Sequence, residues 1–426
     1  MRVLVVGSGA REHAIAWKLR QSPKLTVLFV TPGNAGTASI AENLPVQASD
    51  ITGICDVAKE HRIDLVIVGP EIPLALGLVD RLTELDIAAF GPTQAASRIE
   101  SSKAFSKQLL FDNGIPTAAA ATFTSRVEAR DHVERTTAPM VVKADGLAAG
   151  KGVFICESRE DALEAIEQMM GNEAIFGASG STVIVDEFLR GREVSAHAFS
   201  DGKTVAPMPF ACDYKRAKDG DEGLNTGGIG AFSPALWLDE SHESFIHQHI
   251  TEAVIGAMAD LGTPYAGALY PGIIVTDDGP KVLEFNCRIG DPEAQVLLPR
   301  LKSDFLEICL AVAERRLADA EIEWDTDAYV GVVMTSGGYP GKYETGFEIA
   351  GLNSLEDGVE VFHAGTTLRD DGTIVTSGGR VLTIVAQAAS ITAARAKAYR
   401  NVQRIHFSKA FYRKDIAAPA QDARVD

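Results

Sequence analysis

The sequence predicts a multidomain protein in which an α/β region is followed by regions of α+β type. The chain has 426 residues, enough for two to four domains with well-developed cores. Its first hundred residues alternate short apolar runs with helical stretches, a pattern typical of βαβ units and a parallel sheet. Later segments carry strand-like runs joined by glycine-containing turns, which favours antiparallel hairpins.

The amino-acid composition and net charge indicate which kinds of partner and which cellular setting to expect. Hydrophobic residues make up 46% of the chain and charged residues 23%, as is typical of soluble globular proteins. The formal net charge of −18 argues against a nucleic acid or an anionic membrane surface as partner. No apolar run is long enough to cross a bilayer, and a strand-like run at Val3–Val6 directly follows Met1 and Arg2, so we expect a cytoplasmic protein. The five cysteines are scattered without a C-x-x-C pair, which predicts neither a disulfide framework nor a zinc site.

The N-terminal region is expected to form one ligand-binding crevice. We predict strands at Val3–Val6, Val27–Val30, Asp64–Val68 and Ala88–Phe90, and a helix at Glu12–Arg20. The first three strands end in polar turns that contain Gly7, Gly33 and Gly69. In parallel sheets ligands bind beyond the carboxyl ends of the strands, so these turns outline a single crevice.

The rest of the chain is expected to contain hairpins, helices and one long loop. A helix at Ser101–Asn113 precedes residues 118–195, which predict hairpins around a single helix at Asp161–Met170. The elements expected after these are a polar loop at Asp213–Ser233, a helix at Ser244–Leu261, a strand pair at Tyr265–Val275 and Pro280–Asn286, strands at Tyr329–Thr335 and Arg380–Ala386, and a helix at Ile391–Ile405.

A glycine-rich segment between two apolar runs, residues 139–155, favours a nucleotide site. It contains Lys143, Gly146, Gly150, Lys151 and Gly152. Glycines let backbone N–H groups approach an anion closely and lysines supply positive charge, as in a lid over a polyphosphate. The segment is not a Walker A loop, because Lys151 is followed by glycine rather than by Ser or Thr. An ordinary glycine-rich hairpin turn is the alternative.

The turn that follows the first strand starts like a dinucleotide fingerprint. Gly7 and Gly9 match its first two glycines, but Glu12 occupies the third glycine position and would face a pyrophosphate. A dehydrogenase is therefore disfavoured. The helix that begins here could still hold a single phosphate, and a tight strand-to-helix turn without a ligand is the alternative.

The strand predicted at Pro280–Asn286 carries Glu284 and Asn286 near its end, and these two residues favour a metal site. Alternate side chains on a strand share one face, so Glu284, Asn286 and Arg288 are expected to point together while Phe285 and Cys287 enter the core. Carboxylate and amide oxygens suit Mg²⁺, and an arginine could stabilise an oxyanion or hold a carboxylate. A solvated polar strand face is the alternative, but it gives no reason for the polar cluster that follows at residues 290–293.

Two further polar segments are candidates for binding. Residues 186–193 leave a predicted strand, so their backbone could meet an adenine and Glu193 could accept ribose hydroxyls, although acidic loop residues are usually only solvated. The loop that begins at Asp213 is too polar for a core, and loops of this length are usually functional or disordered. His247 and His249 face different directions on a helix and the other histidines are isolated in the sequence, so no metal pair is predicted. The sequence shows neither a Gly-x-Ser-x-Gly elbow nor a Cys/His pair by spacing, so no protein nucleophile is predicted.

Nine motifs occur in order along the chain and together suggest a family. They are Val5–Ala14 (VVGSGAREHA), Pro32–Gly36 (PGNAG), Val68–Glu71 (VGPE), Val142–Gly152 (VKADGLAAGKG), Asn225–Gly228 (NTGG), Leu283–Asn286 (LEFN), Gly290–Glu293 (GDPE), Val361–Thr366 (VFHAGT) and Gly378–Arg380 (GGR). Over nearly its whole length the chain resembles the phosphoribosylamine–glycine ligases, also called glycinamide ribonucleotide synthetases, of the ATP-grasp superfamily.

The resemblance implies both an architecture and a reaction. It implies a pre-ATP-grasp Rossmann-like domain over residues 1–101, ATP-grasp domains over 102–320 with a small lid at about 120–190, and a small C-terminal α/β domain over 321–426. ATP, glycine and 5-phosphoribosylamine would give glycinamide ribonucleotide, ADP and phosphate through glycyl phosphate, an early step of purine biosynthesis. Mg²⁺ or Mn²⁺ would assist, and the protein would be a monomer or weak dimer.

Site residues carry over from the matching motifs as what the resemblance implies. The expected ATP-binding residues are Lys103, Lys143, Gly146, Gly150, Lys151, Gly152, Asp186, Glu187, Leu189 and Glu193, and the metal ligands are Glu284 and Asn286. Phosphoribosylamine would meet Gly9, Arg11, Glu12, Gly33, Asn34, Gly36, Glu71 and Arg380, and glycine would meet Asp213, Asn225, Thr226, Gly227 and Gly228. Arg288, Lys143 and Asp213 are the expected catalytic residues. Lys143 would be a fixed phosphate ligand, whereas residues 146–152 would order on ATP binding.

The sequence departs from the family pattern near the expected glycine site, and two other functions stay open. Where the family usually has Gln-Asp-His-Lys-Arg, this chain has Cys212–Arg216 (CDYKR), and it has Leu224 and Ile229 in place of a proline and a methionine. Another ATP-grasp carboxylate–amine ligase, or a purine carboxylase that uses bicarbonate, would share the nucleotide residues but should lack the loop from Asp213 to Gly230. A non-catalytic nucleotide-binding regulator would not need the metal-binding strand.

Overall fold

The N-terminal region is a parallel sheet. The computed structural model describes residues 1–147, 152–171 and 177–418. Strands β1 (Arg2–Gly7), β2 (Val27–Pro32), β3 (Glu42–Asn43), β4 (Leu65–Val68) and β5 (Ala88–Phe90) lie in the order β3-β2-β1-β4-β5, all parallel. Helices α1 (Ala10–Leu19), α2 (Ile51–Glu60), α3 (Glu71–Ala75), α4 (Leu78–Thr83) and α5 (Gln94–Ser101) connect or follow the strands. The predicted alternation of strands and helices is confirmed.

The central strand explains why its sequence is a continuous apolar run. All four residues of Val3–Val6 have an exposed fraction of 0%, because helices cover both faces of a parallel sheet. The expected crevice turns lie together at the carboxyl edge, since Gly33 N–H donates to Gly7 O at 3.2 Å and Gly69 N–H donates to Val6 O at 3.0 Å.

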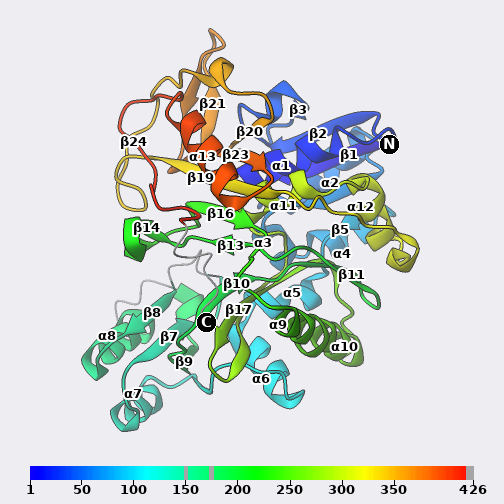
Figure 1. The fold of residues 1–426 in the computed structure, drawn as a ribbon. Helices are drawn as coiled ribbons and strands as arrows, with labels where there is room; N and C mark the ends of the chain where they lie inside the picture. Colours follow the sequence, from blue (N-terminus) through cyan, green and yellow to red (C-terminus); the bar gives the residue numbers. More distant parts are fainter. Residues whose placement is uncertain (148–151, 172–176, 419–426) are drawn as a thin grey trace.

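The lid is an antiparallel sheet with two helices. Its strands β6 (Ala120–Phe123), β9 (Val183–Glu187), β7 (Met140–Ala144) and β8 (Val153–Cys156) lie in that order, and the lid projects at the lower left of Figure 1. Helices α7 (Arg126–Arg135) and α8 (Arg159–Met170) cover it and close a hydrophobic core that is separate from the rest of the molecule. The expectation of a single helix is wrong. Helix α7 buries only Ala129 and Val133, so its sequence lacks a clear apolar period.

The central sheet carries the predicted metal strand. Strands β10 (Arg192–Ser195), β17 (Ala266–Thr276), β11 (Ala198–Asp201) and β12 (Val205–Pro207) form it, and β18 (Gly279–Asn286) pairs with β17. The predicted β17–β18 hairpin is thus confirmed. Helix α6 (Lys103–Asp112) leads into the lid. The predicted helix near 244–261 is built from α9 (Glu240–Phe245), a π-helical run (Ile246–Glu252) and α10 (Ala253–Asp260), and α11 (Glu293–Leu297) and α12 (Phe305–Ala313) follow.

The C-terminal sheet also contains two strands, β13 and β16, from the middle of the chain. Strands β13 (Cys212–Asp213), β16 (Gly230–Ser233), β19 (Ala328–Ser336), β23 (Arg380–Ala388) and β20 (Val359–His363) lie in that order, β24 (Ala410–Phe411) pairs with β19, and α13 (Ile391–Val402) packs on β19 and β23. Two small hairpins form separate two-stranded sheets: β14 (Arg216–Lys218) with β15 (Glu222–Asn225), and β21 (Thr366–Leu368) with β22 (Ile374–Thr376).

The segment expected to be a long loop, Asp213–Ser233, is therefore ordered structure, and that expectation is wrong. Strands β13 and β16 are short and pair with each other, and β16 gains its second partner only from β19, which lies much later in the chain. The hairpin between them is polar because all residues of β15 are exposed. The domain division at residue 320 stays a prediction, and one sheet draws strands from both sides of it.

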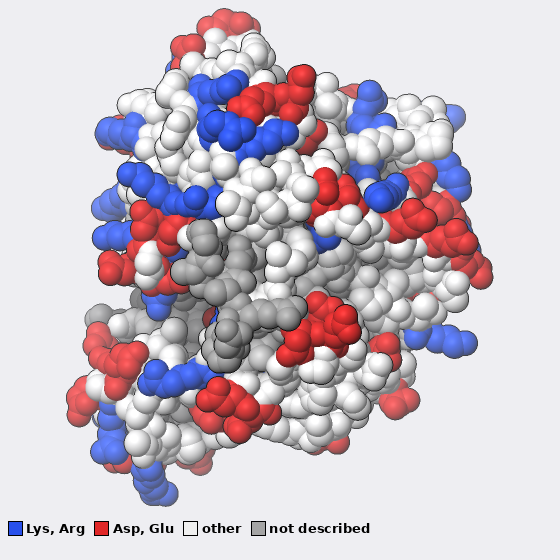
Figure 2. Space-filling view, in the orientation of Figure 1, with Lys and Arg blue, Asp and Glu red and all other residues white. Residues whose placement is uncertain are grey.

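The surface mixes acidic and basic side chains. Figure 2 shows the two signs interspersed over the face that contains the lid and the C-terminal sheet. Within the described ranges, no helix combines the length and the apolar character that a membrane span requires.

Candidate active site

A buried ion cluster joins the lid to helix α6. Asp186, at the end of β9, forms ion pairs with Lys143 Nζ at 2.7 Å and with Lys107 Nζ at 3.1 Å. The Asp186 side chain is 2% exposed. Lys143 reaches it because β7 and β9 pair with Val141 opposite Asp186. Burial lowers the pKa of Lys107 and Asp186 opposes that shift. The sequence motifs missed Lys107, although it lies one helical turn after Lys103 and could have been found from that spacing.

The two expected phosphate lysines connect the glycine-rich segment to the metal strand. Lys103 Nζ donates to Gly146 O at 3.2 Å, and Lys143 Nζ donates to Leu283 O at 3.3 Å. Burial lowers the pKa of Lys103, and Glu284 opposes this effect. Gly152 O accepts from the N–H of Ala144 at 2.8 Å. Gly150 and Lys151, and most of the segment expected to order on ATP binding, lie outside the described residues.

The strand predicted to hold the metal presents two available oxygen donors. Glu284 is half-buried and Asn286 is 9% exposed, and neither side chain has a hydrogen bond or ion pair within the described part of the chain. Phe285 and Cys287 are buried, as strand alternation predicts. Among the described residues, no group of three or more acidic, histidine or cysteine residues is arranged to hold a metal ion without further ligands. One carboxylate and one amide oxygen fit Mg²⁺, which completes its shell with water and nucleotide phosphates.

Arg288 lies between two carboxylates. Its Nε is 3.4 Å from Glu71 Oε2 and its Nη2 is 3.6 Å from Glu100 Oε1. Burial alone would lower the pKa of Arg288, but the two carboxylates outweigh burial and raise it. Burial raises the pKa of Glu100 despite the arginine, whereas Arg288 and Arg11 outweigh burial and lower the pKa of Glu71. Glu100, on α5, also accepts from Cys287 N–H at 2.6 Å and was not predicted from the sequence.

The cluster at residues 290–293 is held in place by hydrogen bonds to residues that the sequence did not indicate. Glu293 Oε1 accepts from Ser195 Oγ at 3.0 Å, and Gly290 N–H donates to His197 Nε2 at 3.1 Å. His197 is fully buried and stacks on Tyr270, with ring centroids 4.1 Å apart, and burial lowers its pKa to about 4. His197 is thus a neutral hydrogen-bond acceptor at neutral pH, and it fixes the loop.

A chain of contacts links the expected ribose residue to the expected glycine residue. Lys215 Nζ lies 2.8 Å from Glu193 Oε2 and 3.2 Å from Asp213 Oδ1. Lys215 O also accepts from the N–H of Thr226 at 2.7 Å. The Lys215 charge is the main cause that lowers the pKa of Glu193. Lys215, which was not among the predicted site residues, therefore brings together segments 193, 213 and 226.

The C-terminal sheet clamps the expected glycine loop. Arg380 donates to Gly227 O and Asp291 O, and its Nη2 lies 2.8 Å from Asp291 Oδ2. Gly227 N–H donates to Tyr339 Oη at 3.1 Å. The structure thus places Arg380 beside the loop of residues 225–228 as well as beside the Gly290–Glu293 cluster. Tyr339 is a further residue that the sequence did not indicate.

At the crevice, Glu12 shapes the turn from within. Its carboxylate accepts from Gly9 N–H and from Arg11 Nε, both at 2.6 Å, and the residue is 2% exposed. A Cβ on Gly7 would lie 2.5 Å from Glu12 Cγ, and one on Gly69 would lie 2.2 Å from Glu12 Oε1. These glycines therefore make room for a buried carboxylate. The expected direct contact of Glu12 with a substrate stays a prediction, and the structure shows its oxygens engaged inside the turn.

The other crevice loop contacts the C-terminal domain. Asn34 Nδ2 donates to Ser8 O at 2.9 Å and to His363 O at 2.7 Å, and Asn34 Oδ1 accepts from Gly36 N–H at 2.8 Å. A cavity of about 450 Å³ lies here between the loop at Gly33 and strand β21. His363 N–H also donates to His13 Nδ1 at 2.9 Å, so two histidines that are isolated in the sequence are neighbours in the fold.

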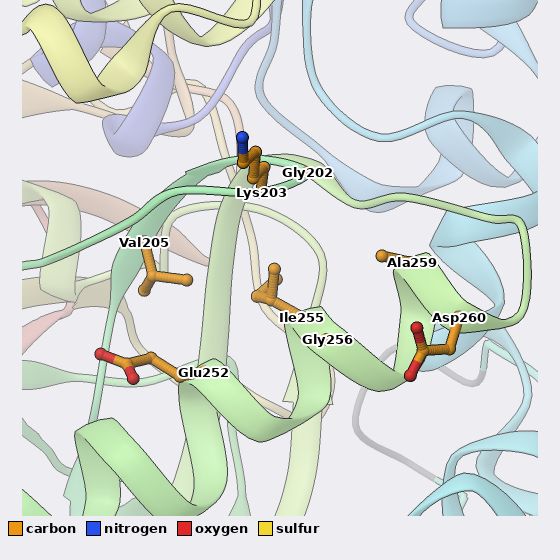
Figure 3. Close-up of a pocket in the computed structure, with 8 residues that line it drawn as sticks. All are labelled: Gly202, Lys203, Val205, Glu252, Ile255, Gly256, Ala259 and Asp260. Atoms are coloured by element: carbon orange, nitrogen blue, oxygen red, sulfur yellow. The ribbon is translucent and has the colours of Figure 1, made fainter.

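A second cavity lies apart from these residues. It has a volume of about 440 Å³ and lies between the β11–β12 turn and the helical run that ends in α10 (Figure 3). Its lining includes Lys203, Glu252 and Asp260 and none of the site residues predicted from the sequence.

Comparisons with known proteins agree over the whole chain. Models of phosphoribosylglycinamide synthetase match its N domain to residues 1–100, its ATP-grasp (A) domain to 101–294 and its C domain to 329–419. Phosphoribosylamine–glycine ligase of Allochromatium vinosum is 47% identical over 420 residues, which cover 98% of both chains. The trifunctional purine biosynthetic protein adenosine-3 of Gallus gallus is 49% identical over 97% of this chain, but the chain spans only 42% of that protein's length.

A solved structure extends the agreement to the fold. Phosphoribosylamine–glycine ligase from Thermotoga maritima matches with a TM-score of 0.86 at 33% identity, covering 98% of this chain and 100% of that one. The predicted fold class, a Rossmann-like N domain, ATP-grasp domains and a C-terminal domain, is confirmed. The chain belongs to the phosphoribosylglycinamide synthetase family.

Proposed function

We propose that this chain ligates glycine to 5-phosphoribosylamine, with ATP converted to ADP and phosphate, in purine biosynthesis. One observation supports this most directly. Lys215 bridges Glu193, expected at the ATP ribose, and Asp213, expected at glycine, with contacts of 2.8 and 3.2 Å. A nucleotide and an amino acid held at these residues would lie side by side, as phosphoryl transfer between them requires. The names of the full-length relatives, phosphoribosylamine–glycine ligase, agree with this reaction.

The chemistry follows in two balanced steps. A carboxylate oxygen of glycine attacks the γ-phosphorus of ATP, which breaks the bond to ADP and forms glycyl phosphate. The amine of phosphoribosylamine then attacks the glycyl carbonyl carbon, so an amide forms, phosphate leaves and the amine loses a proton. Neither step needs a protein nucleophile, and positioning with charge neutralisation supplies the catalysis.

Named residues supply that neutralisation. Lys103 and Lys143 would hold phosphate oxygens, and Arg288 would face the acyl phosphate. Glu284 and Asn286 would hold Mg²⁺, with Mn²⁺ able to substitute, and the bound ion would neutralise charge on the nucleotide phosphates. Asp186, Glu187 and Leu189 would hold adenine, and the crevice residues with Arg380 would hold phosphoribosylamine.

The coupled reaction is the direct test. ADP release over many turnovers is expected to require glycine and phosphoribosylamine together, because glycyl phosphate is consumed, and the site freed for the next turnover, only when the amine attacks. The measurement is ADP formation with each substrate omitted in turn, with phosphoribosylamine generated in the reaction mixture. Equal turnover with bicarbonate in place of glycine would instead identify a carboxylase. ATP binding without turnover under any of these conditions would identify a regulator.

Asp213 predicts an acid limb in the pH profile. Burial, followed by Glu293 and Glu193, raises the pKa of Asp213 to about 7, with Lys215 opposing. If ionised Asp213 holds the glycine ammonium group, kcat/KM for glycine should fall by about tenfold per pH unit below that pKa. The stability of the fold depends on pH in the opposite direction to the activity. Because the folded pKa exceeds the unfolded one, ionising Asp213 costs stability as the pH rises through this window.

The variant Asp213→Asn provides the control for that profile. It should lower kcat/KM for glycine at neutral pH and remove the fall in kcat/KM below about pH 7. A limb of unchanged position in Asp213→Asn would assign the titration to another group.

We further propose the domain division, cellular setting and assembly that the resemblance implies. The divisions are residues 1–101, 102–320 and 321–426, with a lid near 120–190. The protein would act in the cytoplasm as a monomer or weak dimer on small-molecule substrates, without a nucleic-acid or membrane partner.

A further inference from the structure

Among the described residues, the segment Arg413–Ala417 contains the largest fully buried side chain. Arg413 has an exposed fraction of 0%. Its guanidinium donates to Asp221 Oδ1 at 2.7 Å, to Arg216 O at 3.0 Å and to both carboxylate oxygens of Asp415, at 2.7 and 2.5 Å. The group also lies over the ring of Tyr214, with Cζ 4.8 Å from the centroid. A buried arginine needs such a set of acceptors, so its position is closely determined.

Backbone contacts attach the same segment, hereafter the strap, to the tip of the β14–β15 hairpin. Lys414 N–H donates to Asp219 Oδ1 at 2.7 Å, and Gly220 N–H donates to Asp415 Oδ2 at 2.8 Å. Ala417 N–H donates to Tyr214 Oη at 2.8 Å. In Figure 1 the red end of the chain descends beside the green strands β14 and β16. Tyr214, which stands where the family usually has histidine, thus directs its hydroxyl to the strap.

The strap is in turn fixed to the C-terminal domain through α13. Tyr399 Oη donates to Arg413 O at 2.7 Å and accepts from Ile416 N–H at 3.1 Å. Arg395 donates to Ile416 O at 2.9 Å and to Lys414 O at 2.6 Å. The strap therefore transmits the position of a rigid helix to an exposed hairpin.

The hairpin has little else to hold it in place. Every residue from Asp219 to Asn225 is exposed, so this part of the hairpin buries no core. Its two strands continue into the expected glycine site, through Lys215 and Asp213 at one end and Thr226–Gly228 at the other. Arg216 pairs with Asn225, and Thr226 Oγ1 donates to Lys215 O at 2.8 Å. Movement of the hairpin therefore moves both sides of that site.

We propose that Arg413 is a positioning residue for glycine recognition, acting through the β14–β15 hairpin and without touching substrate. The role rests on the proposed function, because it presumes that residues 213 and 225–228 bind glycine. It adds a determinant that lies outside all nine family motifs. Segments that lack a core open locally with little free energy, so one buried anchor can decide their order.

The test compares three variants of the full-length protein with wild type. Arg413→Met removes the anchor, Arg413→Lys keeps its charge without the planar guanidinium, and Arg400→Met removes an exposed arginine, paired with Glu356, from α13 as the matched control. Arg413→Met should reduce kcat/KM for glycine by about 10- to 100-fold, since small displacements in a site carry such costs. The Kd of MgATP should change much less than kcat/KM for glycine, because Lys215 meets the expected nucleotide site only at Glu193 among the described residues. Arg413→Lys should recover part of the loss, and Arg400→Met should match wild type.

Amide hydrogen exchange provides a readout that does not depend on catalysis. In Arg413→Met the amides of residues 216–228 should exchange faster, while those of lid strands β7 and β9 stay unchanged. If Arg413→Met does not fold, Asp221→Asn serves instead, since Asn tolerates the left-handed backbone at φ 56° and removes only one partner of the guanidinium. Unchanged exchange and glycine kcat/KM, or equal losses for glycine and ATP, would overturn the proposal. Faster hairpin exchange in a protein whose wild type shows no glycine-dependent turnover would instead count against the proposed function.

Discussion

Replacing Glu284 with alanine is expected to reduce ligase turnover by about a thousandfold or more, equivalent to more than ~4 kcal/mol of transition-state stabilisation. Glu284 is the only carboxylate of the expected metal pair, and Asn286 alone is a weak ligand for Mg²⁺. The side chain has no hydrogen bond or ion pair within the described residues, and its charge only opposes the lowered pKa of Lys103, so the melting temperature should change little. Turnover at saturating ATP and glycine, over a range of Mg²⁺ concentrations, measures the effect.

The neighbouring turn offers a matched control. Asp278, whose side chain is 85% exposed on the β17–β18 hairpin, carries the same charge away from the site. Asp278→Ala should therefore leave turnover and its Mg²⁺ dependence at the wild-type level. Full activity of Glu284→Ala with Mg²⁺ would show that the metal assignment is wrong.

The second large effect concerns the stability of the lid. Asp186→Ala should destabilise it by about 3 kcal/mol or more, because Lys107 and Lys143 would lose their shared counter-charge in a buried place. Lys107 keeps hydrogen bonds to Thr117 Oγ1 at 2.9 Å and Ala118 O at 3.2 Å, which places the expected loss at the lower end of the range for broken buried pairs. Hydrogen exchange of the most protected amides in β7 and β9 measures it, since the lid has its own core and need not unfold with the rest.

The pH dependence of this effect has a defined sign. Burial already lowers the folded pKa of Lys107, and without Asp186 that pKa falls further below the unfolded value. The destabilisation is therefore full at neutral pH and shrinks as the pH rises toward the unfolded pKa. Glu187→Ala, the exposed neighbour, is the control and should change stability by less than about 0.5 kcal/mol. The double variant Asp186→Ala with Lys107→Met should be more stable than Asp186→Ala alone. A double variant that is less stable by the sum of both single effects would show that the pair is not coupled.

Much of the fold was predictable where local patterns are strong. The strands at Val3–Val6 and Leu65–Val68 are apolar runs that end in glycine turns, and the β17–β18 hairpin has a clear turn signal. Helix α7 was missed because its charged sequence buries only two residues. The hairpin at Arg216–Asn225 was missed because its strands are polar and depend on the strap for their position.

The residues of the candidate site also fall into those that the sequence indicated and those that it did not. Lys143, Glu284 and Asn286 lie on strands within recognisable motifs, so residue type and alternation already indicated chemistry. Lys107 was indicated only by its helical spacing from Lys103. Glu100 and Tyr339 lack any such signal, because each contributes through a partner that lies far away along the chain. Ion pairs and hydrogen bonds of this kind are not local properties of a sequence.

The sequence by itself determined the family, the alternation of elements and the set of groups that suit ATP, a divalent metal and anionic substrates. These depend on periodicity, turn residues and motif order, all of which are local along the chain. Only the tertiary structure decided that Asp186 holds two buried lysines, that Lys215 joins Glu193 to Asp213, and that Arg413 anchors the hairpin beside the expected glycine site. Such contacts arise because burial forces every charged group to find a partner, and the partner is chosen by proximity in space rather than in sequence.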